Sequence, residues 1–217
     1  MTSISWSKDE SPRGRGEALH AVLWCNGEIP SDTILEGLVE AATIFGVDGG
    51  ADKAAASGYD VTEVFGDLDS ISGDWQDKTT ELTDQSSSDL VKSINLLAQR
   101  GFQQIDVVGC EGGSSSHQLG NWAALCEALA GPTIRLHHED SITHRVHSEE
   151  IELSMSEGTR FSIFALTPCS TVRVTGAKWE LFGTEMSLST RGLHNVSLSA
   201  SVRIGADGIL AVMVDRE

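Results

Sequence analysis

The hydrophobic period of the sequence changes at about residue 140, and this change constrains the fold more than any other feature. Before it, short apolar runs alternate with stretches of helical spacing, which is typical of a parallel sheet with crossover helices. From about Ser141 onward, apolar residues recur at every second position in short runs, which indicates antiparallel strands. We therefore predict an α/β fold. An N-terminal Rossmann-like parallel-sheet domain (residues 18–140) is followed by a C-terminal antiparallel β-sandwich domain (residues 141–217).

The same pattern predicts individual elements. In the first domain, strands are expected at residues 18–24, 43–47, 61–65, 105–108 and 133–136, and helices at residues 34–42, 51–57, 86–100 and 116–130. In the second domain, short strands are expected at residues 151–153, 160–166, 171–175, 186–188, 196–202 and 209–214.

Composition narrows the class of protein. The net charge of −17 argues against a nucleic-acid or anionic-membrane partner, because phosphates would be repelled over most of the surface. No stretch approaches the roughly 20 apolar residues that span a bilayer, and residues 1–16 lack the apolar core of a signal peptide. The four cysteines form no Cys-x-x-Cys pair, so we expect reduced thiols, mostly buried. These features predict a cytoplasmic protein with a frayed N-terminal tail.

Glycines and acidic residues follow three of the predicted strands. The segments are Asp48-Gly49-Gly50, Gly66-Asp67-Leu68-Asp69-Ser70 and Gly109-Cys110-Glu111-Gly112-Gly113. Ligands of open parallel sheets collect at the carboxyl ends of the strands. Glycines there let backbone N–H groups approach a phosphate, whereas carboxylates would repel it unless a cation lay between them. Mg²⁺ prefers such oxygen ligands, so Asp67 and Asp69 are predicted to bind a divalent metal that handles a nucleotide's phosphates.

An acidic and a basic residue stand at the predicted start of the helix at residues 86–100. Asp89 and Lys92 are one turn apart, so both can face the same side. Asp89 is a candidate third metal ligand and Lys92 a candidate phosphate contact, although the pair alone better fits a helix N-cap beside a solvated lysine. The sequence has no P-loop, no Gly-x-Gly-x-x-Gly and no nucleophile elbow, which argues against the enzymes that use them.

Taken in order, these segments resemble the motifs of the thiamin pyrophosphokinase family. The family's Asp-Gly-Gly-Ala, Gly-Asp-x-Asp-Ser, Asp-Gln…Asp-x-x-Lys and Gly-Gly-Arg-x-Asp-His motifs correspond to residues 48–51, 66–70, 84–92 and 112–117. In the second domain, residues 175–181 resemble its Thr-Gly-Leu-Lys-Trp-x-Leu element, and residues 189–195 resemble a segment ending in Ser-Asn. Each motif is short, but their shared order makes the resemblance specific from about Ala21 to the C-terminus.

The resemblance implies a homodimeric, Mg²⁺-dependent enzyme with active sites between subunits and between domains. Such enzymes transfer the terminal diphosphate of ATP to the hydroxyethyl group of thiamin, giving thiamin diphosphate and AMP. It assigns Mg²⁺ to Asp67, Asp69 and Asp89. It assigns the positioning of ATP to Asp48, Gly49, Gly50, Gln85, Lys92, Gly112, Gly113 and His117. Thiamin would be received near Trp179, Ser189 and Asn195. Either Asp48 or Asp69 could accept the proton of the substrate hydroxyl.

The sequence departs from the family pattern at three positions. Ser114 and Ser116 stand where the family has Arg and Asp, and His194 stands where it usually has Ser. A serine cannot replace a guanidinium clamp on a polyphosphate. Loss of one such contact costs on the order of 2–4 kcal/mol in the transition state. Arg145, Arg160 and Arg191 are candidate replacements. A diverged member that acts on another alcohol, a member that binds without turnover, and a regulatory or interaction protein on this fold therefore remain alternatives.

Other polar and aromatic residues are expected to have structural roles. His137, His138, His144 and His147 straddle the predicted domain boundary, and we expect exposed loop and strand histidines there instead of a metal site. Trp24, Trp75 and Trp122 are expected to pack inside the protein.

Overall fold

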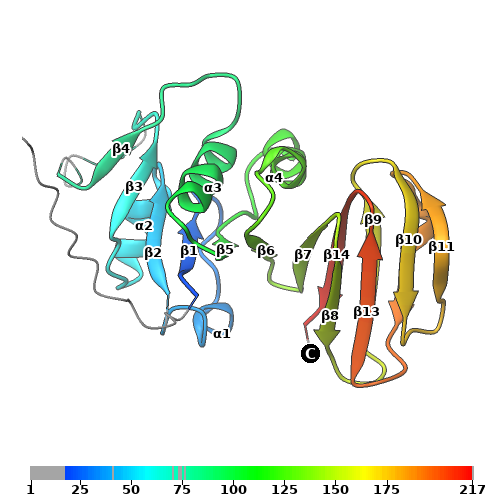
Figure 1. Ribbon diagram of the computed structural model, residues 1–217. Coiled ribbons are helices and arrows are strands. Elements are labelled where there is room, and N and C mark those ends of the chain that lie inside the picture. The colour runs from blue at the N-terminus through cyan, green and yellow to red at the C-terminus, as the bar shows by residue number, and fades with distance from the viewer. Residues whose placement is uncertain (1–17, 41, 70, 73–74, 76, 217) are drawn as a thin grey trace, which may run out of the picture.

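Two sheets form the framework of the protein, whose computed structural model describes residues 18–40, 42–69, 71–72, 75 and 77–216. The expectation for residues 1–16, and that for Ser70, lie outside the described residues. The larger sheet has ten strands in the order β12-β9-β14-β7-β6-β5-β1-β2-β3-β4, and the smaller has four in the order β11-β10-β13-β8 (Figure 1). This arrangement confirms the predicted α/β class.

The described elements have the following bounds. The large sheet contains β1 (His20–Trp24), β2 (Thr43–Val47), β3 (Glu63–Gly66), β4 (Thr79–Glu81), β5 (Gln104–Val108), β6 (Thr133–His137), β7 (Ser141–His147), β9 (Arg160–Ala165), β12 (Asn195–Val196) and β14 (Ile209–Asp215). The small sheet contains β8 (Glu150–Ser154), β10 (Cys169–Thr175), β11 (Leu181–Met186) and β13 (Ser201–Ala206). The helices are α1 (Asp32–Leu35), α2 (Gly50–Ala56), α3 (Asp89–Gln99) and α4 (Ser115–Glu127), with a 3₁₀ turn η2 (Thr190–Gly192).

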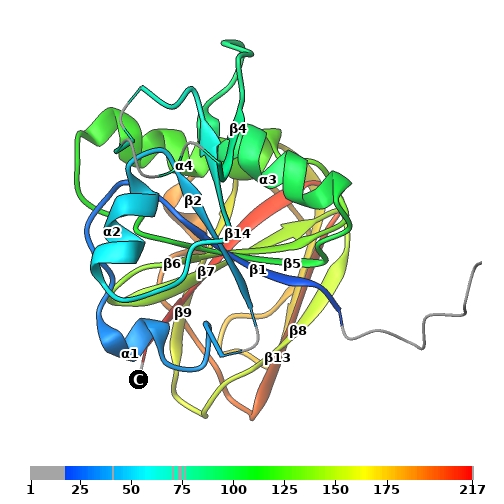
Figure 2. The same ribbon diagram turned by 90° about the vertical axis from the view of Figure 1, so that its left-hand side faces the viewer.

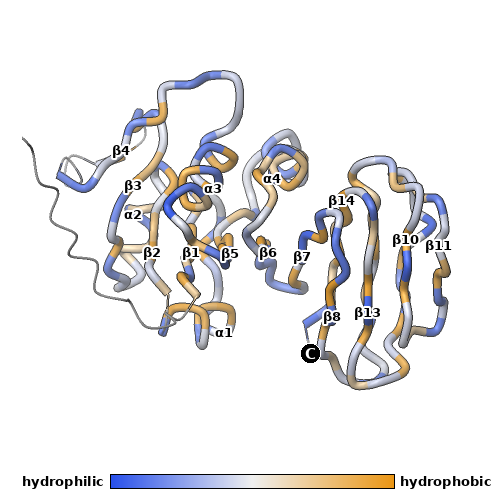
Figure 3. The backbone as a smooth tube through the Cα atoms, in the orientation of Figure 1, coloured by the Kyte–Doolittle hydropathy of each residue, from blue (hydrophilic) through white to orange (hydrophobic). Residues whose placement is uncertain are grey.

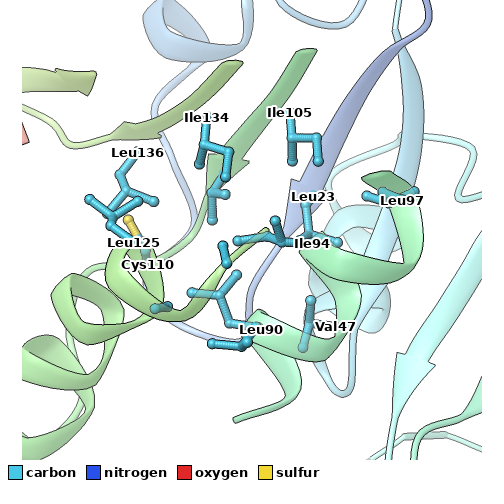
Figure 4. Packing of buried hydrophobic residues seen from close by; sticks show 14 of the residues in the cluster. Leu23, Val47, Leu90, Ile94, Leu97, Ile105, Cys110, Leu125, Ile134 and Leu136 are labelled. Atoms are coloured by element: carbon cyan, nitrogen blue, oxygen red, sulfur yellow. The ribbon is translucent and has the colours of Figure 1, made fainter. Parts of the chain in front are cut away.

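Alternation along the parallel strands places a core on each face of the large sheet. Leu23 on β1 points toward α3 and α4, where it joins the cluster that includes Ile94 and Leu125 (Figure 4). Its neighbour Val22 points to the opposite face, where α1 and α2 pack. Figure 2 shows these two helix pairs on different sides of the strands. Because both faces are covered, these strands read as nearly continuous apolar runs.

The large sheet does not stop where the strand direction changes. Strand β6 pairs in parallel with β5 and antiparallel with β7, so backbone hydrogen bonds cross the predicted domain boundary. Beyond it, a second core lies between the antiparallel strands of the two sheets, with Phe161 and Val212 on one side and Val174 and Ile204 on the other. In Figure 3 the connection between β4 and α3 is largely hydrophilic, in contrast to the apolar strands.

Several predicted elements need correction. The helix expected at residues 34–42 is only the short helix α1, whose residues Ile34 and Leu35 are buried. The chain leaves the helical conformation at Gly37, which has a φ of 81°. The strand expected at residues 186–188 is β11, which ends at Met186. The run at residues 196–202 is divided between β12 and β13, which lie in different sheets. Alternating apolar residues alone do not show which sheet a short strand joins.

Candidate functional site

Three carboxylates from separate segments meet at the strand ends of the parallel sheet. Asp48 directly follows β2, Asp67 directly follows β3, and Asp89 is the first residue of α3. Strands β2 and β3 are parallel neighbours, so their carboxyl ends lie side by side. One ligand oxygen from each of the three residues lies within 4.8 Å of the others. We call Asp48, Asp67 and Asp89 the carboxylate trio.

Unusual backbone conformations bring the trio together. Asp48 has a φ of 47°, and its N–H donates to the Phe65 carbonyl at 2.9 Å. Gly66 has a φ of 144°, and a Cβ there would lie 1.7 Å from Asp48 Oδ1. Leu68 has a φ of 63°, a conformation that costs energy for a residue with a side chain. The glycine before Asp67 is therefore required so that the Asp48 carboxylate can fit beside the β3 end.

The electrostatics of the trio favour a bound cation. Burial and then the charge of Asp89 raise the pKa of Asp48 to about 6, with smaller contributions from Asp67 and Asp69, while a hydrogen bond from the Leu68 N–H opposes the shift. Clustered carboxylates disfavour one another's charged forms unless a counter-charge is present. Three carboxylate oxygens at this spacing fit a hard divalent cation, which takes oxygen ligands.

Asp69 and Asp48 are placed differently from the prediction. The predicted metal ligands were Asp67, Asp69 and Asp89, but the oxygens that converge are those of Asp48, Asp67 and Asp89. Asp69 is exposed, its N–H donates to Asp67 Oδ1 at 3.3 Å, and the charge of Asp67 raises its pKa. The sequence reasoning missed Asp48 as a possible ligand, although its place after a strand was the signal that could have shown it.

Lys92 is fixed beside the trio by three acceptors. Its Nζ lies 2.7 Å from Asp89 Oδ1 and donates to the carbonyls of Leu82 and Asp84 at 2.8 and 2.7 Å. Two of these contacts are hydrogen bonds, and the contact with Asp89 is an ion pair. Lys92 thus braces the segment before α3, on which Gln85 is exposed.

The glycines predicted to approach a phosphate also serve close packing. A Cβ at Gly50 would lie 2.1 Å from the Trp24 carbonyl oxygen, and one at Gly49 would lie 2.7 Å from Asn26 Nδ2. Gly112 and Gly113 have φ values of 77° and 72°, which only glycine adopts readily.

Ser114 and Ser116 form the start of α4. The Ser114 hydroxyl accepts from the His117 N–H at 3.4 Å as the N-cap, and it lies 2.8 Å from the Ser116 hydroxyl and 3.3 Å from His117 Nδ1. The two serines and His117 thus form an exposed polar group that satisfies a helix end. It carries no fixed positive charge.

Two of the three candidate arginines are already engaged with protein groups. Arg145 is buried and donates to the carbonyls of Leu125, Ala128, Leu129 and Pro132 at the end of α4. Arg160 donates from Nε to Asp215 Oδ2 at 2.6 Å. Arg191 is exposed and lines a cavity of the second region, described next. Arg145 is therefore excluded as a substitute for the missing clamp, because its donors are consumed inside the fold.

The predicted thiamin residues meet in a second region. Asn195 is buried, accepts from the Trp179 N–H at 3.1 Å and donates to the Trp179 carbonyl at 2.8 Å. The ring of Trp179 is 54% exposed, and Lys178 Nζ lies 4.6 Å from its centroid. Both residues line a cavity of about 960 Å³. Ser189 is exposed and precedes η2.

The histidines at the predicted boundary are not all exposed, so that expectation was wrong. His137 is buried, with Nε2 at 2.6 Å from Asp106 Oδ1. His20 Nε2 lies 2.6 Å from Asp106 Oδ2, and Arg135 donates to both oxygens from Nε and Nη2 at 2.5 and 2.6 Å. We call Asp106, His20, Arg135 and His137 the buried network. The alternation of side chains along β6 turns His137 toward Asp106. The predicted strand ended at residue 136, so His137 was not expected to belong to the sheet.

Fold and site together define a class of protein: an α/β protein whose parallel strand ends present an oxygen-ligand site suited to a divalent cation. A narrower identification comes from sequence, because residues 36–136 match the family described as "Thiamin pyrophosphokinase, catalytic domain". The resemblance to the thiamin pyrophosphokinase family is thereby confirmed. No curated protein matches the chain.

Solved structures of this family share the fold over most of their length. The thiamine pyrophosphokinase of Bacillus subtilis superposes with a TM-score of 0.76 at 20% identity, over 91% of this chain and 99% of that chain. For the enzyme of Geobacillus thermodenitrificans the TM-score is 0.77 at 17% identity, with 92% and 98% covered. For that of Candida albicans it is 0.73 at 16% identity, with 92% and 90% covered. At these identities the likeness concerns the fold.

Within the described residues, no helix is both long and apolar enough to cross a membrane.

Proposed function

We propose that the protein is a thiamin pyrophosphokinase that transfers the terminal diphosphate of ATP to the hydroxyl of thiamin, with Mg²⁺, giving thiamin diphosphate and AMP. The observation that carries the proposal is the carboxylate trio at the strand ends, within the segment that matches the family's catalytic domain. Without a cation, the three carboxylates would repel a polyphosphate. Their convergence therefore supports a site where a metal ion lies between the trio and the phosphates of a nucleotide.

The roles of the residues follow from their positions. Asp48, Asp67 and Asp89 would hold Mg²⁺. When bound, the ion would neutralise charge on the transferred phosphates and orient them. Lys92 keeps Asp89 in place through their 2.7 Å ion pair. The backbone of Gly112 and Gly113, Gln85 and the exposed start of α4 at His117 would line the remaining path of ATP.

The transfer itself is a displacement at phosphorus. The thiamin hydroxyl oxygen forms a bond to the β-phosphorus of ATP, the bond from that phosphorus to the α–β bridging oxygen breaks, and AMP leaves with the electron pair. The hydroxyl proton passes to a carboxylate. Asp69 suits this step because it stands outside the trio and is solvent-exposed, and its pKa is raised by the charge of Asp67.

The separation of the two regions supports a homodimer. Asp48 and Asp67 follow β2 and β3, whereas Trp179 lies two residues before β11, and these strands lie at opposite ends of the molecule (Figure 1). We therefore propose that the second region of one copy meets the trio of another, with residues 18–140 as the ATP domain and residues 141–217 as the thiamin and dimerisation domain. We also propose that the protein acts in the cytoplasm on small molecules.

One observation favours a second candidate function. Ser114 caps α4 and its hydroxyl contacts that of Ser116, so no cation stands where the family has Arg. A diverged member that uses another alcohol, or that binds ATP or thiamin without turnover, would tolerate this loss. An interaction protein on the same fold would not need the trio at all, so substitution of Asp67 would leave its behaviour unchanged.

The deciding experiment incubates the pure protein with ATP, Mg²⁺ and thiamin and separates the nucleotides and thiamin esters by chromatography. We expect AMP and thiamin diphosphate in equal amounts. Formation of ADP would contradict diphosphate transfer. If ATP binds but does not turn over, the binding-only candidate is favoured, and the double variant Ser114→Arg/Ser116→Asp tests whether restoring the family residues raises the rate.

A further inference from the structure

Asp52, which no motif singles out, accepts hydrogen bonds from two residues that follow Asp67 in the chain. It lies on α2, and its Oδ1 accepts from the Trp75 indole N–H at 2.6 Å and from the Ser72 hydroxyl at 2.7 Å. Its Oδ2 accepts from the Ser72 backbone N–H at 3.0 Å. Three donors from one segment thus converge on a single carboxylate.

These contacts join the two pieces of chain that carry members of the trio. Helix α2 begins at Gly50, two residues after Asp48, whereas Ser72 lies five residues after Asp67. Leu68, directly after Asp67, has a φ of 63°. Leu68, Ile71 and Trp75 pack against the apolar cluster under α1 and α2. A strained turn persists only where its surroundings hold it, and Asp52 supplies its polar anchor.

Asp52 is distinct from the ligands themselves. It does not belong to the group of carboxylates whose oxygens converge. Burial opposes its charge, but hydrogen bonds from Trp75 and Ser72 outweigh that effect and lower its pKa. It is therefore ionised at neutral pH and satisfied by its own partners, so it acts through the backbone.

We propose that Asp52 is a positioning residue for the metal site: it holds Ser72 against α2, so that Asp67, five residues earlier in the chain, stays within ligand distance of Asp48 and Asp89. The proposal rests on the function proposed above, because it takes the trio to be a cation site. Residues that orient metal ligands from outside typically affect metal affinity by roughly 10- to 100-fold when removed.

The test measures Mn²⁺ binding to the nucleotide-free protein by electron paramagnetic resonance, which needs no catalytic turnover. Asp52→Ala is expected to weaken Mn²⁺ binding by about 10- to 100-fold. The matched control is Asp60→Ala, which removes a carboxylate that is 95% exposed and pairs only loosely, at 3.6 Å, with Lys78. That variant should bind Mn²⁺ like the wild type. Circular dichroism in EDTA verifies that each variant is folded at the temperature of the titration.

Two further variants separate positioning from simple loss of charge. Asp52→Asn removes the charge but keeps an oxygen that can accept from Trp75 and the Ser72 hydroxyl, so its loss of affinity should be clearly smaller than that of Asp52→Ala. Trp75→Phe keeps the charge of Asp52 and removes the donor at 2.6 Å, so it should weaken binding measurably. It also provides the test if Asp52→Ala fails to fold.

The outcomes distinguish the two proposals. Folded Asp52→Ala with wild-type affinity would overturn the positioning role and leave the metal site standing. Equal losses in Asp52→Ala and Asp52→Asn, with Trp75→Phe unchanged, would also overturn it, because the effect would then be charge alone. A wild-type protein that binds no Mn²⁺ would instead overturn the metal site of the proposed function.

Discussion

The carboxylate trio and the buried network use aspartate in opposite ways within one sheet. Asp106, in β5, is fully buried, yet an arginine and two histidines contact its two oxygens. Burial alone would raise its pKa, but hydrogen bonds from His137 and Arg135 hold that pKa well below its usual range. In the trio, each carboxylate has other carboxylates as neighbours, with Lys92 as the single cation the structure places against it among the described residues.

The comparison indicates that the charge of Asp106 stabilises the fold, whereas the charges of the trio are suited to binding. A buried charge with all its partners is costly to break, because removal of one member leaves the others uncompensated. A cluster of like charges is a cost to the metal-free protein. The partners of the trio are therefore to be sought outside the chain, whereas those of Asp106 are all inside it. Each region can be altered separately.

The largest effect is expected at Asp106. Asp106→Ala leaves buried His137 and Arg135 without their acceptor, so the free energy of unfolding should fall by about 3–5 kcal/mol. Urea denaturation followed by circular dichroism measures it. The exposed Asp60→Ala serves as the control and should change stability by less than about 0.5 kcal/mol. A loss as small as the control's would show that the network contributes little.

Substitution in the trio should affect turnover and leave folding intact. Asp67→Asn keeps the shape of an exposed side chain and removes a candidate ligand charge. We expect the rate of AMP formation to fall by about 100- to 1000-fold, as when one transition-state contact is removed. Nucleotide chromatography gives the rate. Unchanged turnover in a folded variant would contradict the role of the trio.

The surroundings of the buried network should make stability depend on pH through His144. Burial, and then the charges of Arg135 and His137, lower the pKa of His144 to about 4, while Asp106 opposes the shift. The unfolded chain takes up a proton near pH 6.5 and the folded chain only near pH 4. The contribution of neutral His144 to the free energy of unfolding is therefore fully present above pH 6.5. It is lost as the pH falls toward 4, by up to about 3 kcal/mol.

Urea denaturation of the wild type and of His144→Gln between pH 4 and 7.5 measures this dependence. The variant should show a shallower loss of stability over that interval. Parallel curves for the two proteins would assign the pH dependence to other groups.

The smallest effect is expected from relief of repulsion in the trio. Asp48→Asn removes one like charge at a residue whose φ of 47° asparagine tolerates well. Because the folded protein raises the pKa of Asp48 to about 6, its charge destabilises the metal-free protein at pH 7. Because Asp48 is only half-buried and solvent screens its charge, the free energy of unfolding in EDTA should rise by only about 1 kcal/mol, less than the full shift implies. Stabilisation by added Mg²⁺ should diminish. A less stable variant would argue against repulsion.

Most elements of the parallel half could be predicted from local sequence. The spacing of apolar residues distinguishes helices from strands there, and glycine, serine or aspartate marks their ends. Helix α3 begins three residues after its expected start, and the strand ends that carry Asp48 and Asp67 lie within one residue of the expected positions. The choice of ligands was less predictable, because convergence of Asp48 with Asp67 depends on a positive φ and on the space left by Gly66. The charged and histidine partners of Asp106 lie 86, 29 and 31 residues away in sequence, which no local pattern reveals.

Arg145 links the folding of the parallel half of the chain to that of the antiparallel half. It stands on β7, in the antiparallel half, and its guanidinium donates to carbonyls at the end of α4 and in the segment that leads to β6. A fragment cut after residue 140 would leave those acceptors bare and expose the edge of β6 that β7 normally pairs with. We therefore expect that residues 36–136, which match the family's catalytic domain, do not fold on their own. Heating should melt the chain in one transition instead of two.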